Sequence, residues 1–171
     1  MNKKNELIDL VDSNGVVQQQ FISRSEAASY PDLHLQIVIG VIFDKIGRVL
    51  VHKRAQSKKV NPGHIDHVCG AVISGETIEE AVKREALEET GLCPDNLQMI
   101  THGINKYNRY RYLMAEETGS NPGKVDPTEV EWVQFLHIDE LKAKLSTGVF
   151  PFVEDFFEDM ALALEAKKKE Y

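Results

Sequence analysis

The pattern of apolar and polar positions predicts a set of β-strands and two helices. The longest apolar run, residues 34–43, is rich in β-branched side chains and predicts a strand that is covered on both faces. Shorter runs predict strands over 6–11, 16–22, 48–53, 65–73, 96–102, 109–115 and 129–136. The first two should form an N-terminal β-hairpin over 6–22, because Asn14-Gly15 favours a tight turn between them.

Two further segments have helical spacing. Thr77 and Glu80 form a capping-box pattern ahead of a helix over 77–90, and Gly91 can end that helix. A second helix, about 152–168, carries a stripe of apolar residues that includes Phe156 and Met160. Strands mixed with helices in the middle and at the end predict an α+β class, and the length of 171 residues predicts a single domain, 1–171.

Composition narrows the range of partners. The net charge of −7 argues against general nucleic-acid binding, which needs a broad basic surface. No apolar run approaches the roughly 20 residues that span a bilayer, and the first residues lack the apolar stretch of a signal peptide. The two cysteines, Cys69 and Cys93, give no disulfide framework, so we expect a cytoplasmic protein without a membrane partner.

The helix over 77–90 changes character halfway along one face. Ile78, Ala81 and Val82 give the apolar stripe of a buried face, but the stripe continues as three glutamates, at 85, 88 and 89. Like charges at this spacing repel, and a solvated acidic face is the ordinary explanation for such a cluster. Here the carboxylates extend an apolar stripe and follow a turn that contains Gly70 and Gly75. This arrangement favours binding of a hard divalent cation, Mg²⁺ or Mn²⁺.

The segment from Gly70 to Leu92 resembles the Nudix box at every fixed position. It reads Gly, five residues, Glu76, seven residues, Arg84-Glu85, an aliphatic residue, any residue, Glu88-Glu89, any residue, Gly91 and an aliphatic residue. The resemblance implies the Nudix fold, an α/β/α sandwich around a mixed sheet. It also implies a hydrolase that cleaves a diphosphate linkage in a nucleoside diphosphate joined to a group X, or in a related small molecule.

The same resemblance assigns roles to residues. Glu85, Glu88 and Glu89 would bind the metal, with the Gly70 carbonyl as a further ligand, and Glu76 and Arg84 would fix the loop and helix through an ion pair. Arg84 could instead bind a substrate phosphate, and Gly75 and Gly91 would be structural. The general base would be Glu88, Glu89 or a residue outside the box such as Glu129. Family analogy also suggests a homodimer.

A second resemblance extends over residues 33–35, 49–59, 62–63 and 69–70. These segments are similar to isopentenyl-diphosphate isomerase and to the Nudix hydrolases related to it. Cys69 stands at the catalytic cysteine of the isomerases, and Arg54 and Lys58 match basic residues that hold the diphosphate.

Two departures from the isomerases favour the hydrolase. Ala71 and Ala27 stand where the isomerases have metal-binding histidines, and the Nudix box, usually degenerate in isomerases, is intact here. An isomerase-like enzyme that uses Cys69 is the alternative. A binding protein without catalysis is a third class, which the intact carboxylate set disfavours.

Overall fold

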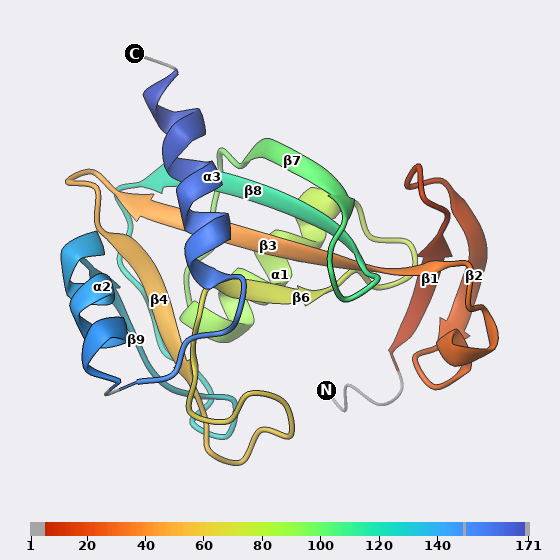
Figure 1. The fold of residues 1–171 in the computed structure, drawn as a ribbon, viewed down its shortest axis with the longest axis horizontal. Coiled ribbons are helices and arrows are strands. Elements are labelled where there is room, and N and C mark those ends of the chain that lie inside the picture. Colours follow the sequence, from red (N-terminus) through yellow and green to blue (C-terminus); the bar gives the residue numbers. More distant parts are fainter. Residues whose placement is uncertain (1–5, 149, 170–171) are drawn as a thin grey trace.

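In a computed structural model, the chain forms one mixed β-sheet assembly with helices on both faces (Figure 1). The structure describes residues 6–148 and 150–169. Residues 1–5, 149 and 170–171, which the single-domain prediction includes, lie outside the described part.

Strand β3 (His34–Asp44) is the centre of the sheet. Along one side it pairs in parallel with β8 (Tyr110–Thr118), from Gln36 opposite Tyr110 to Asp44 opposite Thr118. It also pairs antiparallel with β1 (Leu7–Val11), β6 (Val68–Ala71) and β4 (Val49–Arg54). The sheet is therefore mixed, because parallel and antiparallel neighbours meet on the same strand.

The remaining strands extend this framework. β2 (Val17–Ser23) pairs with β1 and completes the predicted N-terminal hairpin, which projects from one end of the molecule (Figure 1). β5 (Ile65–Asp66) and β9 (Val130–Leu136) pair with β4. β7 (Gln98–Ile104) pairs with β8.

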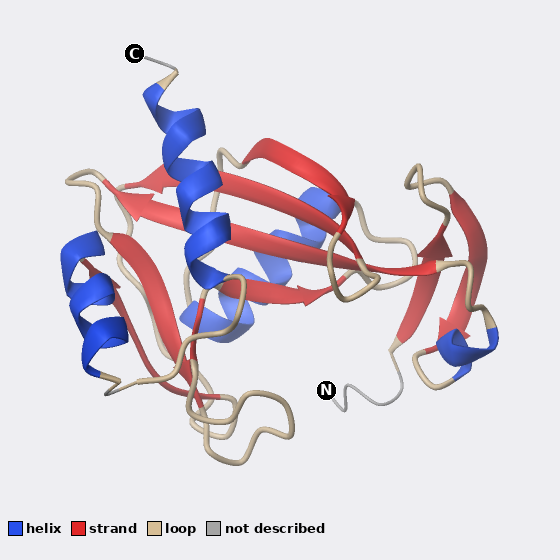
Figure 2. Cartoon of the chain, in the orientation of Figure 1, coloured by secondary structure: helices blue, strands red, loops and turns tan. Residues whose placement is uncertain are grey.

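Helix α1 (Ile78–Thr90) covers one face of the sheet, and α2 (Ile138–Thr147) and α3 (Phe156–Lys168) cover the other (Figure 2). Each face has its own hydrophobic core, one packed against α1 and the other against α2 and α3. Alternate side chains of β3 serve the two cores. Val38 and Ile42 pack with α1, whereas Val41 and Phe43 pack with α3. The apolar run over 34–43 is thus explained by burial on both faces. None of the described helices has the length and apolar content needed to cross a membrane.

Helix α1 begins and ends where its sequence predicts. The Thr77 side chain accepts the Glu80 N–H at 3.2 Å, and the Glu80 carboxylate accepts the Thr77 N–H at 2.8 Å. Gly91 ends the helix in the left-handed conformation, with φ of 65°. The capping box and the terminal glycine therefore fix both ends of this helix, and with them the point at which the preceding loop meets it.

The structure differs from the sequence prediction in four places. The single strand expected over 65–73 is two short strands, β5 and β6, separated at His67. Helix α2 was not predicted. The C-terminal helix begins at Phe156 rather than near residue 152, because Phe152 instead forms a parallel bridge with Ile65 of β5. A short 3-10 helix, η2 (Glu26–Ser29), lies in the polar segment before β3.

Candidate active site

The three glutamates of α1 differ in their exposure. Glu85 is 3% exposed and Glu89 is 8% exposed, whereas the Glu88 side chain is 48% exposed. Carboxylates are rarely buried without a polar partner, because desolvation disfavours the charged form. Glu85 and Glu89 should therefore have polar partners inside the protein, whereas Glu88 reaches the solvent.

Strand β6 receives the two buried carboxylates. The Glu89 Oε2 atom accepts the Cys69 N–H at 2.9 Å. The Glu85 side chain lies directly against Gly70, where a Cβ atom would come within 1.9 Å of Glu85 Cδ. Gly70 is thus required by the close approach of a carboxylate, and α1 and β6 together form one carboxylate-lined surface.

Arg84 connects the loop to the helix. Its Nε and Nη2 atoms donate to the two Glu76 oxygens at 2.6 and 3.0 Å, and Nη1 donates to Glu85 Oε1 at 2.6 Å. Nη2 also donates to the Ala71 carbonyl at 2.9 Å. Burial by itself would lower the pKa of Arg84, but the hydrogen bonds and charges of Glu76 and Glu85 outweigh burial and raise the pKa above its ordinary value. The guanidinium therefore stays charged and joins loop, helix and strand.

Glu76 completes this connection from the loop side. Its Oε2 atom accepts the Ile73 N–H at 3.0 Å, and its own N–H donates to the Ile73 carbonyl at 3.0 Å. Gly75 precedes it with φ of 87°. The Glu76 carboxylate therefore ties the loop before α1 both to itself, through Ile73, and to the helix, through Arg84.

The donor set suits a hard divalent cation. Glu85, Glu88 and Glu89 supply carboxylate oxygens from one helix face, and Mg²⁺ prefers such ligands. The space beside Gly70 that a Cβ would fill is taken by the Glu85 carboxylate, so acidic oxygens lie against the strand backbone. Within residues 6–148 and 150–169, no three His, Cys, Asp or Glu side chains are already gathered as a metal cage. Instead, Glu85 binds the Arg84 guanidinium and Glu89 accepts the Cys69 N–H.

Arg54 and Lys58, the basic residues expected to meet phosphate, lie at the end of β4 and in the loop that follows. Arg54 Nη1 is 3.1 Å from Asp66 Oδ2, and Arg54 Nε donates to the Val60 carbonyl at 3.2 Å. Lys58 forms an ion pair with Glu129. Both cations therefore have carboxylate partners from other segments: Asp66 lies in β5, and Glu129 directly precedes β9.

Cys69 belongs to β6, and its N–H binds Glu89. Its thiol is partly buried and packs toward the core under α3. Burial raises the pKa of Cys69, and the charges of Asp66, Glu89 and Glu85 add to this effect, which Arg54 opposes. The thiol stays protonated at neutral pH, so it is a poor candidate for a thiolate nucleophile.

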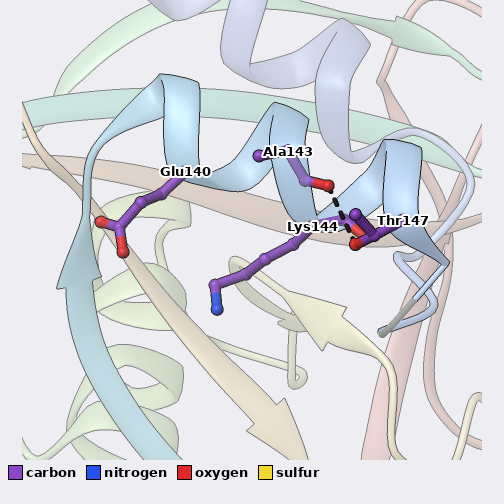
Figure 3. A pocket seen from close by; sticks show the side chains of 4 residues that line it. All are labelled: Glu140, Ala143, Lys144 and Thr147. Atoms are coloured by element: carbon purple, nitrogen blue, oxygen red, sulfur yellow. Dashed lines mark hydrogen bonds between the residues drawn. The ribbon is translucent and has the colours of Figure 1, made fainter.

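Two surface hollows lie elsewhere. One of about 300 Å³ lies along α2 and is lined by Glu140, Ala143, Lys144 and Thr147 (Figure 3). Another of about 220 Å³ lies between α3 and the β7–β8 pair. Neither lining includes a glutamate of α1, so the candidate site is defined by its chemistry rather than by either hollow.

Asp66 is a buried partner of Arg54 that the sequence prediction missed. It is 5% exposed and stands opposite His52 of β4. The available signal was a charged residue between Ile65 and Val68, in a segment predicted to be a buried strand, where an unpaired carboxylate is unusual.

Comparison with known proteins places the chain in context. The model of the NUDIX domain family matches residues 33–156. An uncharacterised Nudix hydrolase of Yersinia pestis is 38% identical over 145 residues, which cover 81% of this chain and 77% of the relative. An isopentenyl-diphosphate Delta-isomerase of Brevibacterium linens is 30% identical over 139 residues, which cover 72% and 75% of the two chains.

Solved structures agree with this grouping. The Deinococcus radiodurans protein DR0079 superposes with a TM-score of 0.69 at 24% identity, covering 88% of this chain and 94% of that one. The NUDIX domain of Shewanella oneidensis NrtR, solved in complex with ADP ribose, gives 0.65 at 16% identity, covering 85% and 99%. These likenesses confirm the expected α+β Nudix fold with its mixed sheet.

Proposed function

Because the chain belongs to the Nudix domain family, we propose that it is a Mg²⁺-dependent hydrolase, with Mn²⁺ as a substitute, that cleaves a diphosphate linkage. The substrate class is a nucleoside diphosphate joined to a group X, or a related small diphosphate. The observation that carries the proposal is the pair of buried carboxylates, Glu85 and Glu89, that α1 presses against Gly70 and Cys69 of β6. Burying charged carboxylates is unfavourable, so core packing does not explain their presence there.

We assign the metal to Glu85, Glu88 and Glu89, with the Gly70 carbonyl as a further oxygen. When bound, such an ion polarises the diphosphate and lowers the pKa of a coordinated water. Charge neutralisation by the cation would also relieve the repulsion among the three carboxylates, which lie on one helix face.

The other residues hold or orient groups. Arg84 and Glu76 fix the loop before α1 through their paired hydrogen bonds, which supports a structural role for Arg84 rather than a contact with substrate. We assign the general base to Glu88, because its side chain is 48% exposed and reaches the solvent, whereas Glu89 accepts a backbone N–H. Glu129, the alternative base, is paired with Lys58.

Arg54 and Lys58 are proposed to bind the phosphates. A guanidinium presents its donors as a planar fork that matches phosphate oxygens, and an ammonium adds a point charge. The ADP ribose bound to the NrtR domain supports a nucleotide with a diphosphate bridge as the ligand class. We propose that the partner is a small molecule and neither nucleic acid nor membrane, that the protein acts in the cytoplasm, and that it can form a homodimer.

The test is hydrolysis of a panel of diphosphates by the pure protein with Mg²⁺. The panel contains nucleotide sugars including ADP-ribose, dinucleotides, nucleoside triphosphates and isopentenyl diphosphate. We expect metal-dependent release of nucleoside monophosphate or phosphate, with ¹⁸O from labelled water in a phosphate product because water attacks phosphorus. Glu89→Gln should lower kcat by about 100-fold or more, since it removes a carboxylate from the charged site.

Matched variants make the result specific. Glu79→Gln, which changes an outward-facing glutamate of the same helix that pairs with Lys83, should leave hydrolysis within twofold of the wild type. Isomerisation of isopentenyl diphosphate without hydrolysis of any other compound would contradict the proposal and favour the Cys69 alternative.

A further inference from the structure

The Arg54–Asp66 pair is an unusual feature of the phosphate-binding end of β4. Asp66 is 5% exposed and the Arg54 side chain is 15% exposed, with Nη1 and Oδ2 separated by 3.1 Å. The sheet does not require this carboxylate, because β5 is held by backbone pairing of Asp66 with His52 and of Ile65 with Lys53. A buried ion pair often contributes little net stability, so its presence needs another explanation.

The contacts of Arg54 fix the direction of its guanidinium. Nη1 is bound to Asp66, and Nε donates to the Val60 carbonyl at 3.2 Å. The backbone of the same residue is also held, because its N–H donates to the His64 carbonyl and its carbonyl accepts the Gly63 N–H. A guanidinium has five N–H donors in one plane. Two of these donors, on opposite sides of the guanidinium, are thus bound by protein, which fixes its orientation and leaves three N–H donors for other partners.

The pair lies beside the carboxylate surface of α1. The Cys69 thiol is within electrostatic reach of Asp66 and Arg54 as well as of Glu85 and Glu89. The Cys69 N–H binds Glu89 directly. Asp66 precedes Cys69 by three residues, so the Arg54–Asp66 pair lies near the strand against which α1 packs its two buried glutamates.

We infer that Asp66 is a positioning residue for substrate binding, which holds Arg54 so that the remaining guanidinium N–H groups face a substrate phosphate. The inference rests on the proposed function, since it assigns Arg54 to a phosphate of that substrate. Positioning a charged fork before the substrate arrives reduces the cost of ordering a long side chain on binding.

The charge state of Asp66 is consistent with this role. Burial raises its pKa to about 6, against the opposing effect of Arg54. Maintaining an ionised carboxylate there is unfavourable for folding, and strained charges of this kind concentrate at functional sites. The surface pair of Lys58 with Glu129 differs, because the Glu129 side chain is 39% exposed and solvent screens it.

The test is a double-mutant cycle on substrate affinity with ADP-ribose, or with the nucleotide sugar of the panel that the wild type cleaves fastest. Asp66→Asn should raise KM by about 10- to 100-fold while kcat stays within threefold, because a misplaced binding group weakens binding before chemistry. Arg54→Ala should raise KM at least as much. In the Arg54→Ala background, Asp66→Asn should add less than twofold, because the two residues act as one unit.

Asp44→Asn is the matched control. Asp44 also bonds an arginine, Arg48, at 2.6 Å, but it lies at the far end of β3. Its substitution should leave KM unchanged. Multiplicative effects of Asp66→Asn and Arg54→Ala, or a normal KM in Asp66→Asn, would overturn the inference. An unchanged KM in Arg54→Ala would overturn it as well.

A pH profile of the folded wild-type protein gives a second measurement that does not depend on a variant folding. The charged and titratable groups around Asp66 come from several elements: Arg54 and His52 of β4, His64, Cys69 of β6 and Asp159 of α3. The bridging phosphates of ADP-ribose do not titrate near neutrality. KM should therefore rise as the pH falls through about 6, where Asp66 gains a proton and releases its hold on Arg54. A KM that is constant from pH 5 to 7.5 would contradict this.

The two proposals fail differently. Wild-type protein that cleaves no member of the panel contradicts the proposed function and removes the basis of the inference. Active wild-type protein whose KM ignores Asp66 contradicts the inference alone.

Discussion

Gly70 is the residue whose substitution the site should tolerate least. An added Cβ would lie 1.9 Å from Glu85 Cδ and 2.0 Å from Oε1, so either α1 or β6 must shift. We expect Gly70→Ala to destabilise the protein by about 1–3 kcal/mol, as overpacking does. We also expect a higher Mg²⁺ concentration for half-maximal hydrolysis, because the Glu85 carboxylate is displaced. Urea unfolding and a Mg²⁺ titration of activity measure the two effects.

The double variant Gly70→Ala/Glu85→Ala separates collision from other causes. Truncating Glu85 removes the atoms that the new Cβ would meet, so Gly70→Ala should destabilise this background much less than it destabilises the wild type. Activity should stay low, because a carboxylate that we propose to bind the metal is lost. Equal destabilisation in both backgrounds would show that the collision is not the cause.

At the residue scale, the sequence predicted the local part of the site and missed the distant part. Glu85, Glu88 and Glu89 could be grouped because helical periodicity alone places them on one face. The partner of Arg54 could not be predicted, because Asp66 reaches it only through the pairing of β4 with β5. Strand pairing depends on the whole sheet, whereas helix periodicity depends on neighbouring residues.

The same contrast explains which elements were predicted. Helix α1 was predicted because it carries a capping box at Thr77 and a terminating glycine at position 91. Helix α2 was missed although Glu140 caps it and Gly148 ends it in the left-handed conformation. Ile138, Leu141 and Leu145 do stand at helical spacing, but this apolar stripe is short and only Leu141 in it is buried, so the period is a weak signal.

Helix α3 is attached to the sheet by a buried ion pair. Arg111 Nη1 of β8 is 2.5 Å from Asp159 Oδ1, and Asp159 is 1% exposed. Burial raises the pKa of Asp159 to about 7, and Arg111 opposes this rise. We expect Arg111→Met to lower the free energy of unfolding by about 3–5 kcal/mol at pH 8, because a buried carboxylate loses its partner.

The loss should shrink as the pH falls. The folded-state pKa of Asp159 exceeds its ordinary value of 3.8, so the ionised form is the one that folding disfavours. At pH 6 the carboxyl of the variant is protonated and the penalty is smaller. Urea unfolding at pH 6 and pH 8 measures this, and Arg111→Met/Asp159→Asn should remove most of the difference between the two pH values. A loss independent of pH would point to packing rather than charge.

At the scale of the whole molecule, β3 joins the two cores. Its side chains alternate between the α1 core and the α3 core, and it pairs with four other strands. Neither core can be completed without it. We therefore propose that the described residues form one domain, as the sequence predicts, and that they unfold as a single unit.

Trp132, the only tryptophan of the chain, reports on the α3 side, where it packs against Phe150. Its fluorescence and the far-ultraviolet circular dichroism should give the same urea midpoint. Two sites three residues apart on β3 extend the test, because Val38 points to the α1 core and Val41 to the α3 core, and both are fully buried.

Val38→Ala and Val41→Ala should each destabilise the protein by about 2 kcal/mol through the cavity that they leave. If the molecule unfolds as one unit, each variant shifts the fluorescence midpoint and the dichroism midpoint together, whichever core it weakens. A Val38→Ala variant that moves the dichroism transition but leaves the Trp132 transition in place would show that the α1 and α3 cores unfold separately. In that case β3 would be a shared boundary of two units, and changes at the glutamate helix would not be transmitted to the Arg111–Asp159 pair beneath α3.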